Sequence, residues 1–113
     1  MNFNIWLSKQ LRSATNDIVA YCFNLYETDD ESIFDVQVVG SKEYTPDDND
    51  WPCHICFSSG DNVYSFHARD WEDALAVFKI KLLDYLQSEE CCLPLKYTHI
   101  AFGFVDGDLE YLC

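Results

Sequence analysis

Positive charge is scarce in this sequence. Its 113 residues include 7 lysines and arginines against 20 aspartates and glutamates, which gives a net charge of -13. A field of this sign repels phosphate backbones and anionic lipid surfaces, and it speeds the encounter with basic partners. We therefore expect no binding to nucleic acid or to a membrane. The acidity itself has two interpretations, which are solubility alone or attraction of a basic protein.

Long apolar runs are lacking as well. No segment approaches the roughly 18 apolar residues that a membrane-spanning helix needs. The first twelve residues, MNFNIWLSKQLR, place their basic residues after the apolar ones, the reverse of a secretory signal. Hydrophobic residues make up 49% of the chain, which is enough for one core in a single domain, residues 1–113. We expect a cytoplasmic protein whose six cysteines are reduced thiols.

Catalytic and cofactor-binding motifs are absent. The sequence contains no G-x-S-x-G, H-E-x-x-H, P-loop or G-x-G-x-x-G pattern, and its three histidines are scattered. The aspartates at 47, 48 and 50 suggest calcium, but an EF-hand loop needs Gly at its sixth position and Glu at its twelfth. Counted from Asp47, these positions hold Pro52 and Ser58. We expect no enzymatic activity, no cofactor and no metal.

One cysteine pair has the spacing of a reactive site. Cys53 and Cys56 form a C-x-x-C after a Trp-Pro pair, but a redox site of this kind needs its first cysteine at a helix N-terminus. Here both lie in a strand-like run, where residues 53 and 56 face opposite sides. Zinc would need four converging ligands, and the adjacent Cys91 and Cys92 rarely chelate together. A small thiol or zinc protein is thus a minor alternative.

Residues 70–87, DWEDALAVFKIKLLDYLQ, predict one long amphipathic helix. Asp70 is a good N-cap residue. At 100° per residue, seven side chains fall on one continuous apolar arc that is wide enough to cover a sheet. They are Trp71, Ala74, Leu75, Phe78, Leu82, Tyr85 and Leu86.

Apolar runs before and after this helix predict strands. Residues 18–27 are apolar on both alternating faces, which indicates a central strand, and residues 32–40 alternate cleanly after an acidic turn. The two runs predict an antiparallel hairpin. Residues 53–57 and 63–66 predict a second hairpin. Residues 97–105 predict a final strand, with 109–112 pairing back onto it after the turn at 106–108.

The order of elements predicts the fold class. Strands do not alternate with helices, so we expect an α+β domain rather than a doubly wound parallel sheet. Its mainly antiparallel sheet of about five strands has the helix 70–87 packed on one face, and an N-terminal helix over 3–14 capped by Asn2. Three apolar residues of the long helix point away from its buried arc: Val77, Ile80 and Leu83. The first helix and the C-terminal tail cover them, or else a partner does, and a homodimer is one such partner.

The acidic residues gather in turns and in one long loop. They are Glu27, Asp29, Asp30 and Glu31, then Asp47, Asp48 and Asp50, and finally Asp106, Asp108 and Glu110. Aromatic residues are interleaved with them, namely Tyr26, Tyr44, Trp51 and Tyr111. Aromatic anchors surrounded by carboxylates suit a binder of a basic protein, since the charges steer the encounter and the rings supply affinity. An ordinary solvated acidic surface is the alternative.

The second half of the chain carries the segments WEDALAVF at 71–78 and IAFGFVDGDLE at 100–110. With these segments the small acidic chain resembles bacterial immunity proteins, which neutralise the toxin domains of contact-dependent growth inhibition and other polymorphic toxin systems. The span 71–110 is about a third of the chain. The resemblance implies a tight one-to-one complex with a basic toxin, commonly a nuclease, whose active site is blocked. Immunity proteins share no single fold or set of binding residues, so no residue role is carried over.

Charge and resemblance together predict a non-catalytic immunity protein that binds a cognate basic toxin domain. The predicted contact residues are first Asp47, Asp48, Asp50 and Trp51, and second Asp29, Asp30 and Glu31. An acidic nucleic-acid mimic that inhibits a DNA-binding protein is the main alternative. Such a mimic would carry carboxylates at phosphate-like spacing along an elongated surface, whereas the acidic residues here cluster in turns.

Overall fold

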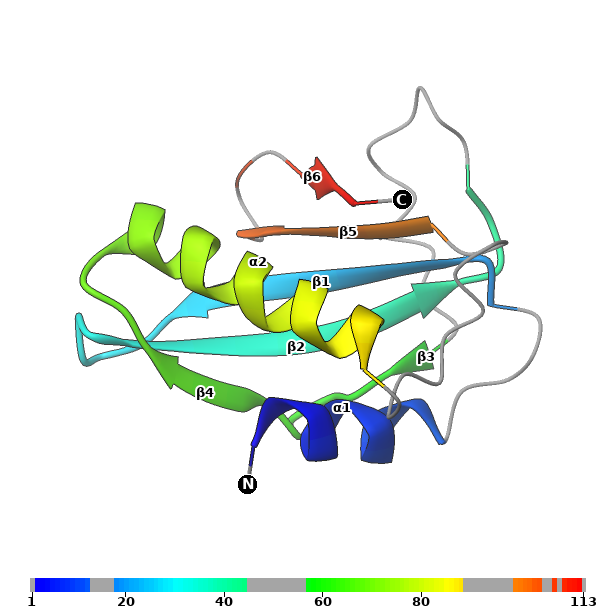
Figure 1. Ribbon diagram of the computed structural model, residues 1–113, viewed down its shortest axis with the longest axis horizontal. Helices are drawn as coiled ribbons and strands as arrows, with labels where there is room; N and C mark the ends of the chain where they lie inside the picture. The colour runs from blue at the N-terminus through cyan, green and yellow to red at the C-terminus, as the bar shows by residue number, and fades with distance from the viewer. Residues whose placement is uncertain are drawn as a thin grey trace.

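The fold is seen in a computed structural model, which describes residues 2–12, 18–44, 57–88, 99–104, 107 and 109–112. Two helices and six strands follow one another along these ranges (Figure 1). In chain order they are α1 (Phe3–Leu11), β1 (Ala20–Glu27), β2 (Ile33–Ser41), β3 (Phe57–Ser58), β4 (Tyr64–His67), α2 (Trp71–Gln87), β5 (His99–Phe104) and β6 (Glu110–Tyr111). None of the described helices is long and apolar enough to cross a membrane.

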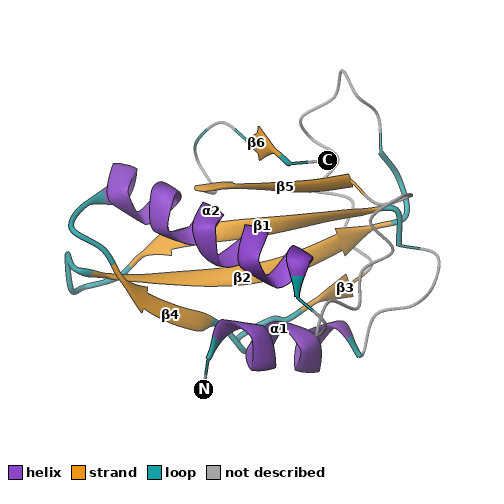
Figure 2. Ribbon diagram, viewed as in Figure 1, coloured by secondary structure: helices purple, strands orange, loops and turns teal. Residues whose placement is uncertain are grey.

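The strands form one mixed sheet in the order β3-β2-β1-β5-β6, and β4 also pairs with β2. All described pairings are antiparallel except that of β1 with β5, which is parallel. The predicted α+β class and the mainly antiparallel sheet are confirmed. Parallel neighbours need a crossover connection between them. The α2 helix lies within that connection and packs across the sheet (Figure 2).

Strand β1 is the centre of the sheet. It pairs with β2 on one side, from Ala20 opposite Ser41 to Glu27 opposite Phe34, and with β5 on the other. Its two apolar faces are both covered: Tyr21, Phe23 and Leu25 face the helices, whereas Ala20 and Cys22 belong to a smaller cluster on the opposite side. The prediction of a central strand is confirmed, as is the hairpin that β1 forms with β2.

The second predicted hairpin is wrong for the residues that the structure describes, and residues 53–56 of it lie outside them. Strands β3 and β4 do not pair with each other, since both run antiparallel to β2 along the same edge. Val36 and Val39 are three positions apart on β2, whereas their partners Tyr64 and Ser58 are six positions apart. The edge strand therefore holds an insertion of three residues. The turn-like residues 58–62 therefore mark a bulge in one interrupted strand, for which the sequence signal is the same as for a hairpin.

Helices α1 and α2 cover one face of the sheet and bury an aromatic core against it (Figure 2). Phe78 of α2 lies at the centre of this core, within 5.5–6.1 Å of the rings of Phe3, Phe23, Phe66 and Phe102. Hydrogen bonds also join the layers: the Trp6 indole N–H donates to the carbonyl of Asn62 at 3.1 Å. Asn2 caps α1 as predicted, accepting from the N–H of Ile5. The described helix ends at Leu11, and residues 13 and 14 of the predicted helix lie outside the described residues.

Helix α2 begins after its predicted N-cap, Asp70, and buries Ala74, Phe78, Leu82 and Tyr85. Trp71 was predicted inside, but it is 53% exposed. It lies on the buried arc by angle, yet it is the first residue of the helix, where α2 enters from the end of the sheet. Periodicity reports the angle around a helix axis but not where along that axis the core stops.

Candidate functional site

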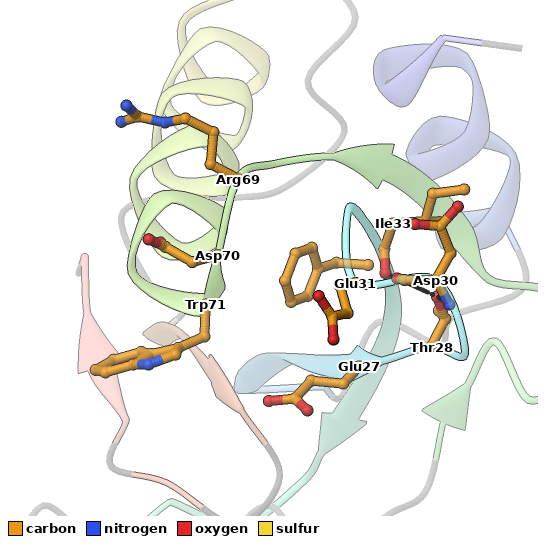
Figure 3. Close-up of a pocket in the computed structure, with 9 residues that line it drawn as sticks. Glu27, Thr28, Asp30, Glu31, Ile33, Arg69, Asp70 and Trp71 are labelled. Carbon is orange, nitrogen blue, oxygen red and sulfur yellow. Dashed lines mark hydrogen bonds between the residues drawn. The ribbon is translucent and has the colours of Figure 1, made fainter.

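An open pocket of about 300 Å³ lies at one end of the sheet, between the β1–β2 turn and the start of α2. It is lined by Glu27, Thr28, Asp30, Glu31, Ile33, Phe34, Arg69, Asp70 and Trp71. Four of these nine residues are acidic and one is basic. In Figure 3 Glu27 and Glu31 lie between the turn and α2, whereas the Trp71 indole is turned away from the turn.

The β1–β2 turn is held in one shape by its own polar groups. The Thr28 hydroxyl donates to the carbonyl of Ile33 at 2.8 Å and accepts from the N–H of Asp30 at 3.2 Å. The Asp30 carboxylate accepts from both the N–H and the hydroxyl of Ser32, at 2.9 and 2.7 Å. These bonds are the local Asx and Ser/Thr turn contacts that such residues form readily. The acidic side chains therefore project from a defined backbone.

The same contacts determine the ionisation of the Asp30 carboxyl. The N–H of Ser32, and then its hydroxyl, lower the pKa of the Asp30 carboxyl below its ordinary value. Hydrogen bonds to the charged form favour that form. Asp30 is consequently a carboxylate at neutral pH, with a negative charge at the rim of the pocket.

A capping arrangement fixes the other wall. The Asp70 carboxylate accepts from the N–H of Asp73 at 2.8 Å, and Asp73 in turn accepts from the N–H of Arg69 at 2.9 Å. The first contact satisfies an N–H group that a helix start otherwise leaves open, and the second holds the residue before the N-cap. Arg69 also approaches Asp73 through its guanidinium, at 3.5 Å, and its side chain is almost fully exposed. Arg69, the basic residue among the described residues that line the pocket, therefore lies close to a carboxylate of α2.

The arrangement combines negative charge with an exposed indole. Asp70 and Trp71 line the pocket together with Glu27, Asp30 and Glu31, and the Trp71 indole is exposed beside these carboxylates. Lysine and arginine side chains are attracted to both features, and guanidinium groups pair with carboxylates through two parallel hydrogen bonds. The chemistry that the pocket offers is recognition of a basic side chain.

The predicted contact residues fall into two groups. Asp29, Asp30 and Glu31 are exposed, and the last two line the pocket. The first-ranked set, Asp47, Asp48, Asp50 and Trp51, lies outside the described residues. Sequence reasoning missed Asp70 and Trp71 as site residues, because the first was assigned only to capping and the second to the core. An acidic turn is visible in sequence, but nothing local indicates which helix start it faces.

Within the described ranges, no group of three or more His, Cys, Asp or Glu side chains could hold a metal ion. Cys53, His54, Cys56, Cys91 and Cys92 lie outside those ranges. Cys22 is buried in the sheet, and its thiol donates to the Asn24 side-chain oxygen at 3.3 Å.

The opposite face of the sheet holds a small aromatic group. The rings of Tyr44 and His99 stack with centroids 3.7 Å apart, and Tyr111 meets Tyr44 edge-on at 6.5 Å. They stand beside a small apolar cluster that includes Ala20, Cys22 and Ala101. Of the three rings, Tyr44 packs against this cluster and helps to cover it.

Comparison with known proteins gives no relative: no family model, no curated protein and no solved structure matches this chain.

Proposed function

We propose that this chain is a non-catalytic immunity protein that binds and neutralises a cognate basic toxin domain, of the nuclease class, in the cytoplasm. The observation that carries the proposal is the acidic pocket beside the exposed Trp71, on a chain with a net charge of -13. The resemblance of segments 71–78 and 100–110 to immunity proteins also supports the proposal.

Electrostatics supplies the physical reason for this pairing. A nuclease holds phosphate groups with lysine and arginine side chains, so its active-site surface is positive. The carboxylates of Glu27, Asp30, Glu31 and Asp70 offer the same sign of charge as a phosphate backbone. A protein that presents them from a fixed turn occupies the basic surface without being cleaved. Complementary charge also raises the association rate, which matters for an inhibitor that must act on arrival of the toxin.

The shape of the molecule favours a protein partner of this kind over nucleic-acid mimicry. Its principal extents are 36 × 31 × 24 Å, so the surface is not elongated. The acidic pocket occupies one end of the sheet, whereas a mimic needs carboxylates repeated along a strand-like path. The nucleic-acid mimic remains the alternative that the following test separates.

The test is co-expression with the C-terminal domain encoded immediately upstream of this gene. We expect that domain to arrest growth alone, to be tolerated when this chain is present, and to co-purify with it as a one-to-one complex. A double variant, Glu31→Lys with Trp71→Ala, should lose protection while it keeps the thermal stability of the wild type. A harmless domain that does not bind would contradict the proposal, and binding of the wild type to a DNA-binding protein instead would favour the mimic.

A further inference from the structure

The outward face of α2 carries an exposed apolar stripe. Besides Trp71 at its start, six positions of the helix are exposed and follow one another at helical spacing: Glu72, Ala76, Ile80, Leu83, Asp84 and Gln87. Ile80 is 61% exposed and Leu83 is 36% exposed. Val77, predicted to lie outside with them, is partly buried and packs against the core. The stripe is thus centred on Ile80 and Leu83, one turn of helix apart.

Acidic side chains border this stripe. Glu72 and Asp84 lie toward its two ends, so the apolar centre has an acidic border. Both lysines of α2 are turned to other groups: Lys79 pairs with Glu110 at 2.8 Å, and Lys81 stands 5.8 Å from the centre of the Tyr64 ring. An apolar centre with a charged rim is the usual anatomy of a protein–protein contact surface.

We infer that this face of α2 is a docking surface for the same basic partner that the acidic pocket attracts. The inference rests on the proposed function. It adds that the pocket attracts the partner by charge, whereas the α2 face holds the partner after docking. The partner surface that fits is an apolar patch bordered by lysine or arginine side chains. Helix α2 connects the two regions, because Trp71 lines the pocket at the start of the helix and Ile80 and Leu83 follow along the same helix.

Charge complementarity selects this occupant over a second copy of the chain. Two copies would each bring a net charge of -13, and their α2 faces would place the acidic borders against each other. Like charges brought together at an interface oppose association, whereas a basic border on the partner pairs with Glu72 and Asp84.

The two regions should act on different steps of binding. Long-range attraction by the carboxylates of the pocket governs the rate of encounter. Apolar side chains make contact only after docking, so Ile80 and Leu83 govern the rate of dissociation. A docking surface on α2 should therefore change the dissociation rate, whereas an apolar surface without a binding role should change neither rate.

The experiment measures the association and dissociation rates of the purified upstream toxin domain with the intact protein and its variants. In Ile80→Ala/Leu83→Ala, alanine keeps the helix propensity and the exposed sites leave the core intact. We expect its dissociation rate to rise about tenfold, the size of an effective anchor, with the association rate changed less than about twofold. Ile5, which is 51% exposed on α1, supplies the matched control, and Ile5→Ala should leave both rates unchanged.

A second variant guards against an ambiguous result. Ala76→Arg places a cation in the exposed stripe, so it should weaken binding to a basic partner by at least about tenfold while the melting temperature stays near that of the wild type. If the double alanine variant dissociates like the wild type while Glu31→Lys still slows association, the inference on α2 fails and the proposed function stands. If the wild type forms no complex, both fail. A wild-type dimer that Ala76→Arg dissociates would assign the face to a second copy instead.

Discussion

The interior of the β1–β2 hairpin and its turn differ sharply, although they are neighbours in sequence. Leu25 and Phe34 are buried under the helices, and only two residues farther along the chain Glu27 is exposed at the rim of the acidic pocket. The interior is held by apolar packing against Phe78 and its neighbours. The turn is held by local hydrogen bonds of Thr28, Asp30 and Ser32, which need no core.

This difference separates stability from recognition. A turn that is fixed by its own polar groups can carry a dense set of carboxylates without placing any of them in an apolar environment. The core can then be built for packing alone. We therefore expect substitutions in the core to change the free energy of unfolding, and substitutions in the pocket to change binding.

The largest effect should come from Phe78→Ala. Phe78 is fully buried and contacts four other aromatic rings, so its removal leaves a cavity that the rigid sheet cannot close. We expect a loss of about 3–5 kcal/mol in the free energy of unfolding, measured by urea denaturation. Ile80→Ala, on the exposed side of the same helix, should cost less than about 0.5 kcal/mol. Equal losses in the two variants would mean that the faces of α2 are misassigned.

A smaller effect is expected at the junction between core and pocket. Asp70→Ala removes the acceptor for the N–H of Asp73 and should destabilise the protein by about 1 kcal/mol. Asp84→Ala, an exposed carboxylate on the same helix, should leave the urea midpoint nearly unchanged. A midpoint for Asp70→Ala equal to that of Asp84→Ala would show that the cap contributes nothing to α2.

The smallest effect should be the loss of stability at acid pH that comes from Asp30 in the turn and Asp73 beside the helix cap. The N–H of Arg69 lowers the pKa of Asp73, and the N–H of Ser32 lowers that of Asp30, relative to the ordinary value of 3.8. A lowered folded-state pKa gives stability that is present above the unfolded-state pKa and is lost as pH falls through the folded-state value. Between about pH 5 and pH 2.5, the free energy of unfolding measured by urea denaturation should therefore fall less in Asp30→Asn/Asp73→Asn than in the wild type. A parallel decline in both proteins would contradict this assignment.

Much of the fold is predictable from sequence because its signals are local. Two apolar faces predicted β1 as the central strand, and the apolar period predicted α2 with Asp70 as its cap. The edge of the sheet was not predictable in the same way. The residues between β3 and β4 have turn chemistry, and only pairing with β2 decides between a hairpin and an interrupted strand. The parallel pairing of β5 with β1 is likewise a tertiary outcome.

The candidate site was predictable only in part. Asp30 and Glu31 follow from the density of charge in one turn. Asp70 and Trp71 join them because β4 brings the start of α2 beside that turn, where Ala68 donates to the carbonyl of Ser32 at 3.0 Å. A contact between residues 36 positions apart in the chain leaves no mark in local composition.

The most direct test of the central claim is the rate at which the upstream toxin domain associates with the wild type, Glu31→Lys and Asp61→Lys across a range of ionic strength. Both substitutions change the net charge equally, but Asp61 is exposed on the bulge between β3 and β4, away from the residues that line the pocket. We predict that Glu31→Lys slows association about three- to tenfold and flattens its salt dependence, whereas Asp61→Lys stays within about twofold of the wild type. Equal rates and equal salt slopes in the two variants would contradict recognition through the acidic pocket.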